Sequence, residues 1–395
     1  MIHKILYLPC FVYAISFSSI ILLYQVGWSD MFPVLNGFLL YFLLATIGIS
    51  IVLAFIQKKH LNIPINDVNL SPSFIKRAMY FIGIGYTLEF LYESSIPIIK
   101  TFFSPSYSYD DFNGIPTFHF VLGTFSIFFS ILMFNYYLSN RSRKKMFQFI
   151  ATLVPYILIM NRGAFMIVFS AMIFLFIMRM KAINLKTIIM PFVVLGIVLY
   201  FFGVVGNIRA EQTKEDKEYL LRVAGATDKF IKSGVPVEFY WSYIYIISPI
   251  GNLQNLMIQK KDVFEIDNVG VFTITQLFPD FISKRLSAFF LDEKNLENVD
   301  GSGYFVTPLL NAPTVYFGAY VLLGSVGLVV MFFVIMFSTI IYPYLIKKNS
   351  KYYSMSIASL NAIILLSIFN NMWFNVGTVL LWPIIFSAVE RLKLK

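Results

Sequence analysis

The chain has 395 residues, of which 58% are hydrophobic and only 13% are charged, and its net charge is +10. Soluble globular domains are nearer to half apolar and a quarter charged. Here charge is missing over long continuous stretches, which excludes an ordinary soluble domain. The basic residues stand in short clusters between apolar runs, as in the loops of membrane proteins. This distribution also excludes the single basic face of a nucleic-acid-binding protein.

The first half of the chain predicts seven membrane helices separated by short loops. The first run lacks the small-residue cleavage pattern of a signal peptide, so we interpret it as a retained helix. Most of the runs have the roughly 20 apolar residues that a bilayer requires. The predicted helices are Ile5–Tyr24, Val34–Ile56, Ala78–Ile99, Thr117–Leu138, Phe147–Met160, Ala164–Met178 and Thr187–Val205.

The 33-residue interval between Lys145 and Arg179 predicts two short helices, not one. A single helix of that length would extend about 50 Å, whereas the hydrocarbon core is about 30 Å thick. It would also carry Arg179 and the lysines after it to the outer side. A turn at Asn161-Arg162-Gly163 avoids both problems and places Arg162 at the outer membrane face.

Residues 206–314 form one extended polar region, with 11 Lys/Arg and 14 Asp/Glu. The loops on the other side hold 18 basic residues, and their only acids are Asp67 and Glu390. Basic loops face the cytoplasm, so this asymmetry predicts a large periplasmic loop and two cytoplasmic termini. It divides the chain into a bundle (1–205), the periplasmic loop (206–314) and C-terminal helices (315–395).

Two segments of the large loop are apolar enough to touch the membrane. Glu211–Lys232 reads as an amphipathic helix on the membrane surface. Phe239–Ile258 is aromatic and is interrupted by Ser248-Pro249-Ile250-Gly251. We favour a re-entrant or interfacial segment here, because a full crossing would carry the acidic residues 292–300 into the cytoplasm.

With Phe239–Ile258 outside the membrane, the fold is an all-α polytopic membrane protein of about ten helices. The eighth helix ends at Ile346, and the last two form a hairpin around Asn370-Asn371. If Phe239–Ile258 crosses, Tyr304–Ile346 is long enough for two helices and the total is twelve.

Arginines near the outer face are candidates for binding a diphosphate, because guanidinium groups match phosphate oxygens in pairs. Arg162 lies at the predicted turn, and Arg209 follows the seventh predicted helix in Gly206-Asn207-Ile208-Arg209. For both, the alternative is an interfacial arginine that reaches water. Arg285, with Lys284 and Arg222, is a weaker candidate, for which a solvated loop face is the alternative.

Acidic residues and a histidine near the same face are candidates for proton transfer. Glu89 and Glu93 share one helix face, and carboxylates at that depth rarely face lipid. The pair could line a cavity, act as a base or pair with an arginine. Asp110, Asp111 and His119 bracket residues 112–116, and a positioned base there could take a hydroxyl proton. A turn with solvated acids is the alternative.

Several common chemistries are absent from the sequence. The three histidines (His3, His60 and His119) form no metal-binding motif, and Cys10 is the only cysteine. No phosphate-binding GxxxxGK[ST] loop is present, which excludes ATP hydrolysis through that motif. The sequence therefore predicts no metal and no cofactor.

Five short stretches carry a resemblance to a known family. They are Tyr109–Pro116, Asn161–Phe165, Gly206–Arg209, Tyr245–Leu253 and Asn311–Thr314. In their order around one large outer loop, the chain resembles the Wzy-type O-antigen polymerases, with a fold like that of the GT-C-type glycosyltransferases. The first stretch departs from the family's usual run by an asparagine before its glycine.

The resemblance implies a metal-independent glycosyltransferase of the bacterial inner membrane that uses no nucleotide sugar. It would pass a growing glycan from undecaprenyl diphosphate to the non-reducing end of a lipid-linked repeat unit, at the periplasmic face. Its partners would be these undecaprenyl-diphosphate-linked oligosaccharides, membrane lipid and a chain-length regulator protein. The alternatives are an O-antigen ligase and a lipid-linked oligosaccharide flippase, although we find no internal repeat of the kind that many transporters show.

Site residues follow from the same resemblance and from the predicted topology. Arg162, Arg209 and Arg285 would bind the diphosphate. Asp111, Glu93 or His119 would take the proton of the acceptor hydroxyl.

Overall fold

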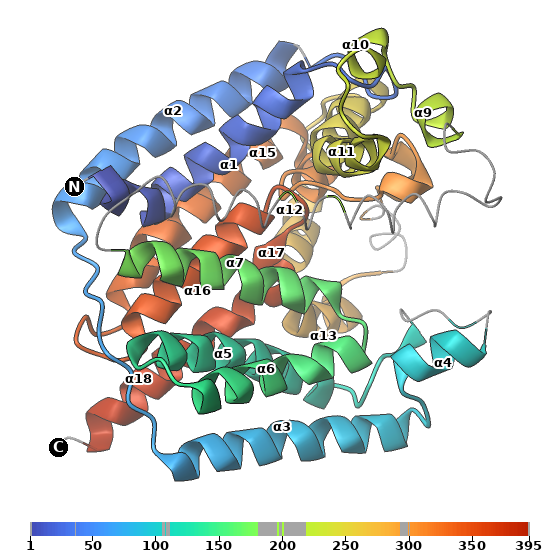
Figure 1. The fold of residues 1–395 in the computed structure, drawn as a ribbon. Coiled ribbons are helices and arrows are strands. Elements are labelled where there is room, and N and C mark those ends of the chain that lie inside the picture. The colour runs from blue at the N-terminus through green and yellow to red at the C-terminus, as the bar shows by residue number, and fades with distance from the viewer. Residues whose placement is uncertain are drawn as a thin grey trace.

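In the computed structural model the chain is built from helices (Figure 1). The structure describes residues 2–35, 37–104, 107, 111–180, 196, 200, 219–292, 299 and 301–393. Within these ranges every regular element is a helix, and an isolated bridge joins Ser29 to Ala226.

The chain is a helical membrane protein. Five helical segments of the described ranges are long and apolar enough to cross a bilayer. They are Gly37–His60, Phe118–Ser139, Arg162–Arg179, Phe317–Tyr344 and Met372–Glu390. The predicted helix Thr187–Val205 lies outside the described residues.

Most helices of the first half follow the predicted apolar runs with shifts of a few residues. A short 3₁₀ turn (Ile2–Tyr7) precedes the first helix. The observed bounds are Pro9–Gln25 for α1, Gly37–His60 for α2, Pro72–Tyr92 for α3 and Phe118–Ser139 for α5.

The predicted helix Ala78–Ile99 is wrong at both ends. Helix α3 begins after Ser71, because the Ser71 hydroxyl accepts a hydrogen bond from the backbone N–H of Phe74 at 3.3 Å and caps the helix. Helix α3 then ends at Tyr92, because Ser94 has a φ of +49° and leaves the helical conformation before Pro97. A separate short helix, α4 (Pro97–Phe103), starts at that proline.

The two short helices predicted around Arg162 are confirmed as α6 (Arg143–Leu158) and α7 (Arg162–Arg179). Asn161 caps α7, because its side chain accepts a hydrogen bond from the backbone N–H of Ala164 at 2.9 Å. Both helices pack against α5.

The predicted amphipathic helix Glu211–Lys232 is not continuous where the structure describes it. Residues 219–232 contain two short helices, α9 (Tyr219–Val223) and α10 (Asp228–Ile231). Between them the chain turns against the loop after α1, where the Asp30 N–H donates to the Gly225 carbonyl at 2.8 Å. The turn uses backbone groups that a continuous helix would need for itself.

The interruption predicted near Pro249 is also wrong, because α11 (Val237–Gln259) passes through it. Proline lacks the N–H that would bond to the Tyr245 carbonyl. The Ser248 hydroxyl donates to that carbonyl instead, at 2.9 Å. Helix α11 packs against α1 and α15.

The next segment consists of short helices with a change of pitch. Helix α12 (Asn268–Phe272) continues into a π-helical turn (Thr273–Leu277, η3), and α13 (Asp280–Phe290) follows. Two 3₁₀ turns, η4 (Ser302–Tyr304) and η5 (Pro308–Leu310), lead to α15.

The C-terminal helices are interrupted at two places. Helix α15 (Phe317–Ile341) is kinked at Gly324, where the Asp262 carboxylate accepts a hydrogen bond from the Ser325 N–H at 2.7 Å. A 3₁₀ turn, η6 (Tyr342–Tyr344), follows α15. The predicted last two helices correspond to α16, the short α17, a 3₁₀ turn (η7) and α18. Their bounds are Tyr353–Leu366, Met372–Val376, Gly377–Leu380 and Leu381–Lys393.

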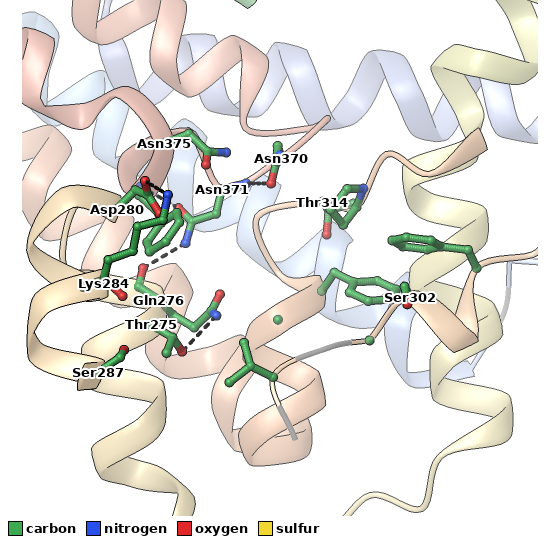
Figure 2. A pocket seen from close by; sticks show the side chains of 18 of the residues that line it. Thr275, Gln276, Asp280, Lys284, Ser287, Ser302, Thr314, Asn370, Asn371 and Asn375 are labelled. Atoms are coloured by element: carbon green, nitrogen blue, oxygen red, sulfur yellow. Dashed lines mark hydrogen bonds and ion pairs between the residues drawn. The ribbon is translucent and has the colours of Figure 1, made fainter. Parts of the chain in front are cut away.

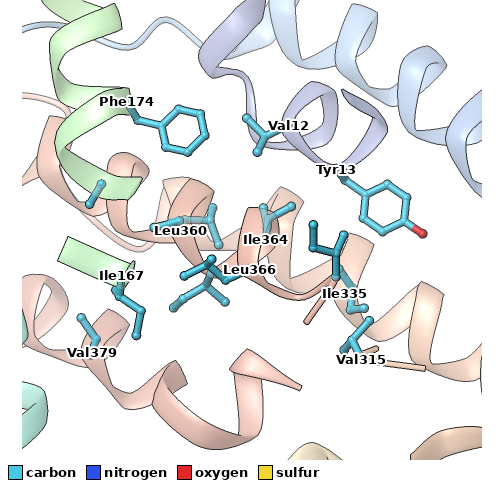
Figure 3. Close-up of a cluster of buried hydrophobic side chains, with 14 of the residues drawn as sticks. Val12, Tyr13, Ile167, Phe174, Val315, Ile335, Leu360, Ile364, Leu366 and Val379 are labelled. Atoms are coloured by element: carbon cyan, nitrogen blue, oxygen red, sulfur yellow. The ribbon is translucent and has the colours of Figure 1, made fainter. Parts of the chain in front are cut away.

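The centre of the bundle is an apolar cluster of side chains from α1, α7, α15 and α16 (Figure 3). Val12, Phe174 and Leu360 are among its buried members. Within it, the Asn361 amide nitrogen donates to the Tyr7 carbonyl at 2.8 Å, whereas the amide oxygen of the same side chain has no partner among the described residues.

The basic loops gather at one end of the bundle, where both termini lie, on the left of Figure 1. There Arg179 donates to Asn135 and to Ser139, each at 2.9 Å, and Asn66 donates to the Lys348 carbonyl at 2.6 Å. Helices α4, α9, α10 and α13 lie toward the opposite end. That both termini share one end agrees with the predicted topology; which end faces the cytoplasm stays a prediction.

Candidate functional site

Helices α3 and α5 approach closely at the end of the bundle opposite the termini. A Cβ on Gly85 would lie 2.7 Å from Cδ1 of Leu122, so a larger residue there would displace the Leu122 side chain. One turn further along α3, and one turn back along α5, the same face carries Glu89 and His119. The close packing therefore positions these two side chains against each other.

Glu89 and His119 form a buried ion pair or hydrogen bond. Oε2 of Glu89 lies 2.8 Å from Nδ1 of His119, and the Glu89 side chain is 0% exposed, whereas that of His119 is 30% exposed. The other oxygen, Oε1, is buried and has no hydrogen-bond partner among the described residues. The carboxylate of the pair is thus buried, and the imidazole is partly accessible to solvent.

This arrangement can serve as a general base. An ionised carboxylate only accepts hydrogen bonds, so the neutral ring carries its proton on Nδ1 and keeps a lone pair on Nε2. A carboxylate that fixes the tautomer also stabilises the imidazolium that forms when Nε2 takes a proton. A substrate hydroxyl at the exposed edge of His119 would find such a base.

The loop that carries Asp111 folds over the pair. Gly114 has a φ of +64°, and a Cβ there would lie 2.7 Å from Nδ1 of His119 and 2.9 Å from Oε1 of Glu89. The ring of Phe112 meets His119 edge-on, with 5.7 Å between centroids. The loop therefore encloses the pair on the side away from α5 and restricts water.

Helix α13 of the large loop docks on the first turn of α5, next to this pair. Phe281 stacks on Phe120 with 4.5 Å between ring centroids. Arg285 donates through Nη2 to the hydroxyl of Thr117 and through Nη1 to the Phe281 carbonyl at 2.7 Å. The contact places the exposed guanidinium of Arg285 against Thr117, which precedes His119 by two residues in the chain.

The predicted site residues are only partly brought together. His119 lies in the first turn of α5, and Arg285 contacts Thr117, the residue that precedes this helix. Asp111 is exposed on the loop that covers the pair. Glu93 is half-buried at the end of α3 and forms no ion pair with any residue that the structure describes. Exposed Arg162 begins α7.

Two further candidates, Arg209 and Asp110, lie outside the described residues. Near Arg162, the Thr101 hydroxyl of α4 lies 3.5 Å from the Met160 sulfur, so this turn is in contact with the α3–α4 side of the bundle. No contact of the described chain joins Arg162 to His119.

A cavity of about 550 Å³ with a mixed polar and apolar lining lies on another face of α13 (Figure 2). It opens between α13, the π-helical turn and the two chain segments that lead into α15 and α17. Its polar lining is made up of Thr275, Gln276, Asp280, Ser283, Lys284, Ser287, Ser302, Thr314, Asn370, Asn371 and Asn375. One helix therefore separates the cavity from Arg285 and the pair behind it.

Sequence reasoning missed most of this lining and preferred Glu93 to Glu89. Asn370-Asn371 was interpreted only as a hairpin turn, although two amides inside an apolar run are unusual and indicate a polar cavity. Gln276 and Ser283 had no such signal, because they lie in a polar region. Glu89 and Glu93 are four residues apart and share one helix face, so their spacing could not distinguish them.

No group of three or more metal-binding side chains occurs in the described part of the chain. Glu89 and His119 supply two such donors. Compared with family models, curated proteins and solved structures, the chain shows no match. The function therefore has to be argued from the residues themselves.

Proposed function

We propose that the chain is a membrane glycosyltransferase that polymerises undecaprenyl-diphosphate-linked repeat units into O-antigen polysaccharide. The observation that carries this proposal is the carboxylate–imidazole pair beside an exposed arginine, at the end of the bundle away from the termini. A base for a hydroxyl and a cation for a diphosphate are the two groups that such a transfer requires.

In the proposed reaction, Nε2 of His119 takes the proton of the acceptor sugar hydroxyl. The acceptor oxygen forms a bond to the anomeric carbon of the donor glycan, and the bond from that carbon to the diphosphate breaks. Undecaprenyl diphosphate leaves with the electron pair. Glu89 holds the ring and stabilises its positive charge, and Arg285 offsets the charge of the leaving group.

The same proposal includes the finer topology and the location of the protein. The chain would cross the inner membrane ten or twelve times, with a GT-C-like fold and both termini in the cytoplasm. This topology is supported by the gathering of the basic loops at the end where both termini lie, since basic loops face the cytoplasm. The pair and Arg285 would then face the periplasm, where lipid-linked repeat units are joined.

A lipid-linked oligosaccharide flippase is the second candidate. It is favoured by the cavity, which lies where helices are interrupted, a feature of transporter binding sites. The buried pair argues for chemistry instead, because transport needs no base for a hydroxyl.

Deletion of the gene in its host, followed by a lipopolysaccharide gel, tests the function. Loss of a polymerase should leave lipid A–core that carries a single repeat unit, and the wild-type gene should restore long chains. Bare core after deletion would instead indicate a ligase or a flippase and would contradict the proposal.

The arginine assignments have their own test. Arg285→Ala should raise the KM for the lipid-linked donor at least about tenfold, because a charge-assisted hydrogen bond contributes about 1.5–3 kcal/mol. Arg162→Ala should shorten the O-chains at normal membrane levels. Lys232→Ala, on an exposed turn of the same loop, is the matched control, and an unchanged KM in Arg285→Ala would remove that residue from the diphosphate site.

A further inference from the structure

We propose that the cavity beside α13 binds an uncharged sugar of the substrate and determines which repeat unit the protein accepts. The inference rests on the proposed function and concerns a different part of the substrate from the diphosphate. It assigns specificity to Ser283, Ser287 and Asn375, residues that face the cavity without touching the Glu89–His119 pair.

Some hydrogen-bonding groups of the cavity have no partner among the residues that the structure describes. The hydroxyls of Ser283 and Ser287 belong to side chains that are more than nine-tenths buried, and neither makes a hydrogen bond to a described residue. The half-buried Asn375 amide also makes no side-chain hydrogen bond to a described residue, and its side chain is directed into the cavity (Figure 2). Buried polar groups are normally hydrogen-bonded, and the hydroxyls of a sugar would supply the partners.

The charge of the cavity is balanced, which points to an uncharged ligand. Asp280 and Lys284 are the charged residues of the lining, and their side chains form an ion pair of 2.9 Å. The Lys284 side chain is 77% exposed, so its charge is largely solvated at the mouth. A phosphate would find no desolvated cation in the cavity, whereas amides and hydroxyls suit a polyhydroxylated ring.

Apolar surface completes the lining. Phe305, Phe317 and Phe374 all border the cavity, and aromatic rings pack well against the C–H faces of a pyranose. The volume of about 550 Å³ lies within the range of small-molecule sites, about 300–1,000 Å³. Sites of this kind combine an apolar wall with a few placed polar groups.

The cavity is also held open before any ligand arrives. The Asn371 side chain donates to the Gln276 carbonyl at 2.8 Å and accepts from the Phe374 N–H at 3.2 Å. These bonds tie the π-helical turn to the start of α17, so both walls are fixed relative to each other. A preformed site loses less entropy on binding.

Helix α13 connects this cavity to the proposed chemistry. Ser283 and Ser287 are four residues apart and face the cavity, whereas Phe281 and Arg285 occupy the opposite face of the helix and contact α5. A sugar in the cavity would therefore lie on one side of α13, and a diphosphate at Arg285 on the other side.

The test is binding of free sugars to the full-length protein in lipid nanodiscs. The probes are neutral hexoses, N-acetylhexosamines and 6-deoxyhexoses as short free oligosaccharides, with inorganic diphosphate as a charged probe. Isothermal titration calorimetry measures the affinity, and the fluorescence of Trp373, next to Phe374, reports binding independently. One class of neutral sugar should bind saturably.

The variants Ser287→Ala and Asn375→Ala should each weaken that binding about fivefold to tenfold, because one hydrogen bond contributes about 1–1.5 kcal/mol. Ser287→Leu should abolish it by filling the cavity. Asn140→Ala, at the opposite end of the bundle, is the matched control and should bind as the wild type does.

The outcomes separate this inference from the proposed function. Glu89→Gln should bind the sugar normally but fail to transfer it. Sugar binding by a wild type that forms no glycan would retain the cavity assignment and remove the polymerase. Three results in an active protein would overturn the cavity assignment alone. They are the absence of sugar binding, sugar binding that Ser287→Leu leaves unchanged, and cavity variants that weaken the binding of diphosphate.

Discussion

Glu89→Gln is expected to lower the rate of glycan transfer by at least about a hundredfold, because a positioned general base contributes roughly 10²–10⁴-fold. Glutamine has the same shape, but its amide donates to Nδ1 of His119 and moves the ring proton to Nε2. The nitrogen that faces the substrate then has no lone pair. The rate is measured with purified protein, a lipid-linked donor and a lipid-linked acceptor.

The expected loss should appear in kcat, because Glu89 acts on the ring and not on the substrate. Glu238→Gln, on the first turn of α11, is the matched control and should keep wild-type kinetics. A wild-type rate for Glu89→Gln, together with a large loss for Glu93→Gln, would show that the other glutamate of α3 is the base. His119→Gln should reproduce the loss of Glu89→Gln without adding to it, as for residues that act as one unit.

Gly114→Ala is expected to reduce transfer at least about tenfold and to lower the free energy of unfolding by about 1–2 kcal/mol. The backbone at Gly114 has a φ of +64°, a conformation that costs an L-residue about 1–2 kcal/mol. A methyl group there would also lie 2.7 Å from Nδ1 of His119. The ring must move, and its bond to Glu89 must lengthen. Thermal unfolding in detergent and the transfer assay measure the two effects.

Two further variants separate strain from displacement of the ring. Gly114→Asn should lose less stability, since asparagine tolerates this backbone conformation, but it should still lose transfer because its Cβ meets the same atoms. Gly123→Ala, on α5 with no atom within 4 Å of the added methyl, should be neutral or stabilising in a helix. Wild-type transfer in Gly114→Asn would show that the loop does not position His119.

Some features of the fold could be predicted because they depend on local properties of the chain. The turn between α6 and α7 followed from helix length and from the charge of Arg179, and Asn161 is a common capping residue. The ends of α3 were predictable in principle, since Ser71 and Pro97 mark a helix start and a break. The apolar run across them concealed these signals.

The partners within the candidate site were not predictable in this way. Glu89 and Glu93 share a helix face, so spacing alone could not choose between them. The choice depends on Gly85, which lets α3 approach α5 at one position and brings Glu89 level with His119.

The sequence by itself determined the class of protein and the short hairpin at Arg162. It also determined which loops share the basic end of the helix bundle and which share the acidic end. These follow from hydropathy and charge, which each segment carries without reference to any other. Only the tertiary structure decided that His119 pairs with a residue 30 positions away, and that Arg285 contacts Thr117, 168 positions away. Such contacts depend on how helices pack, because the register between two helices is set by side-chain fit along their whole interface.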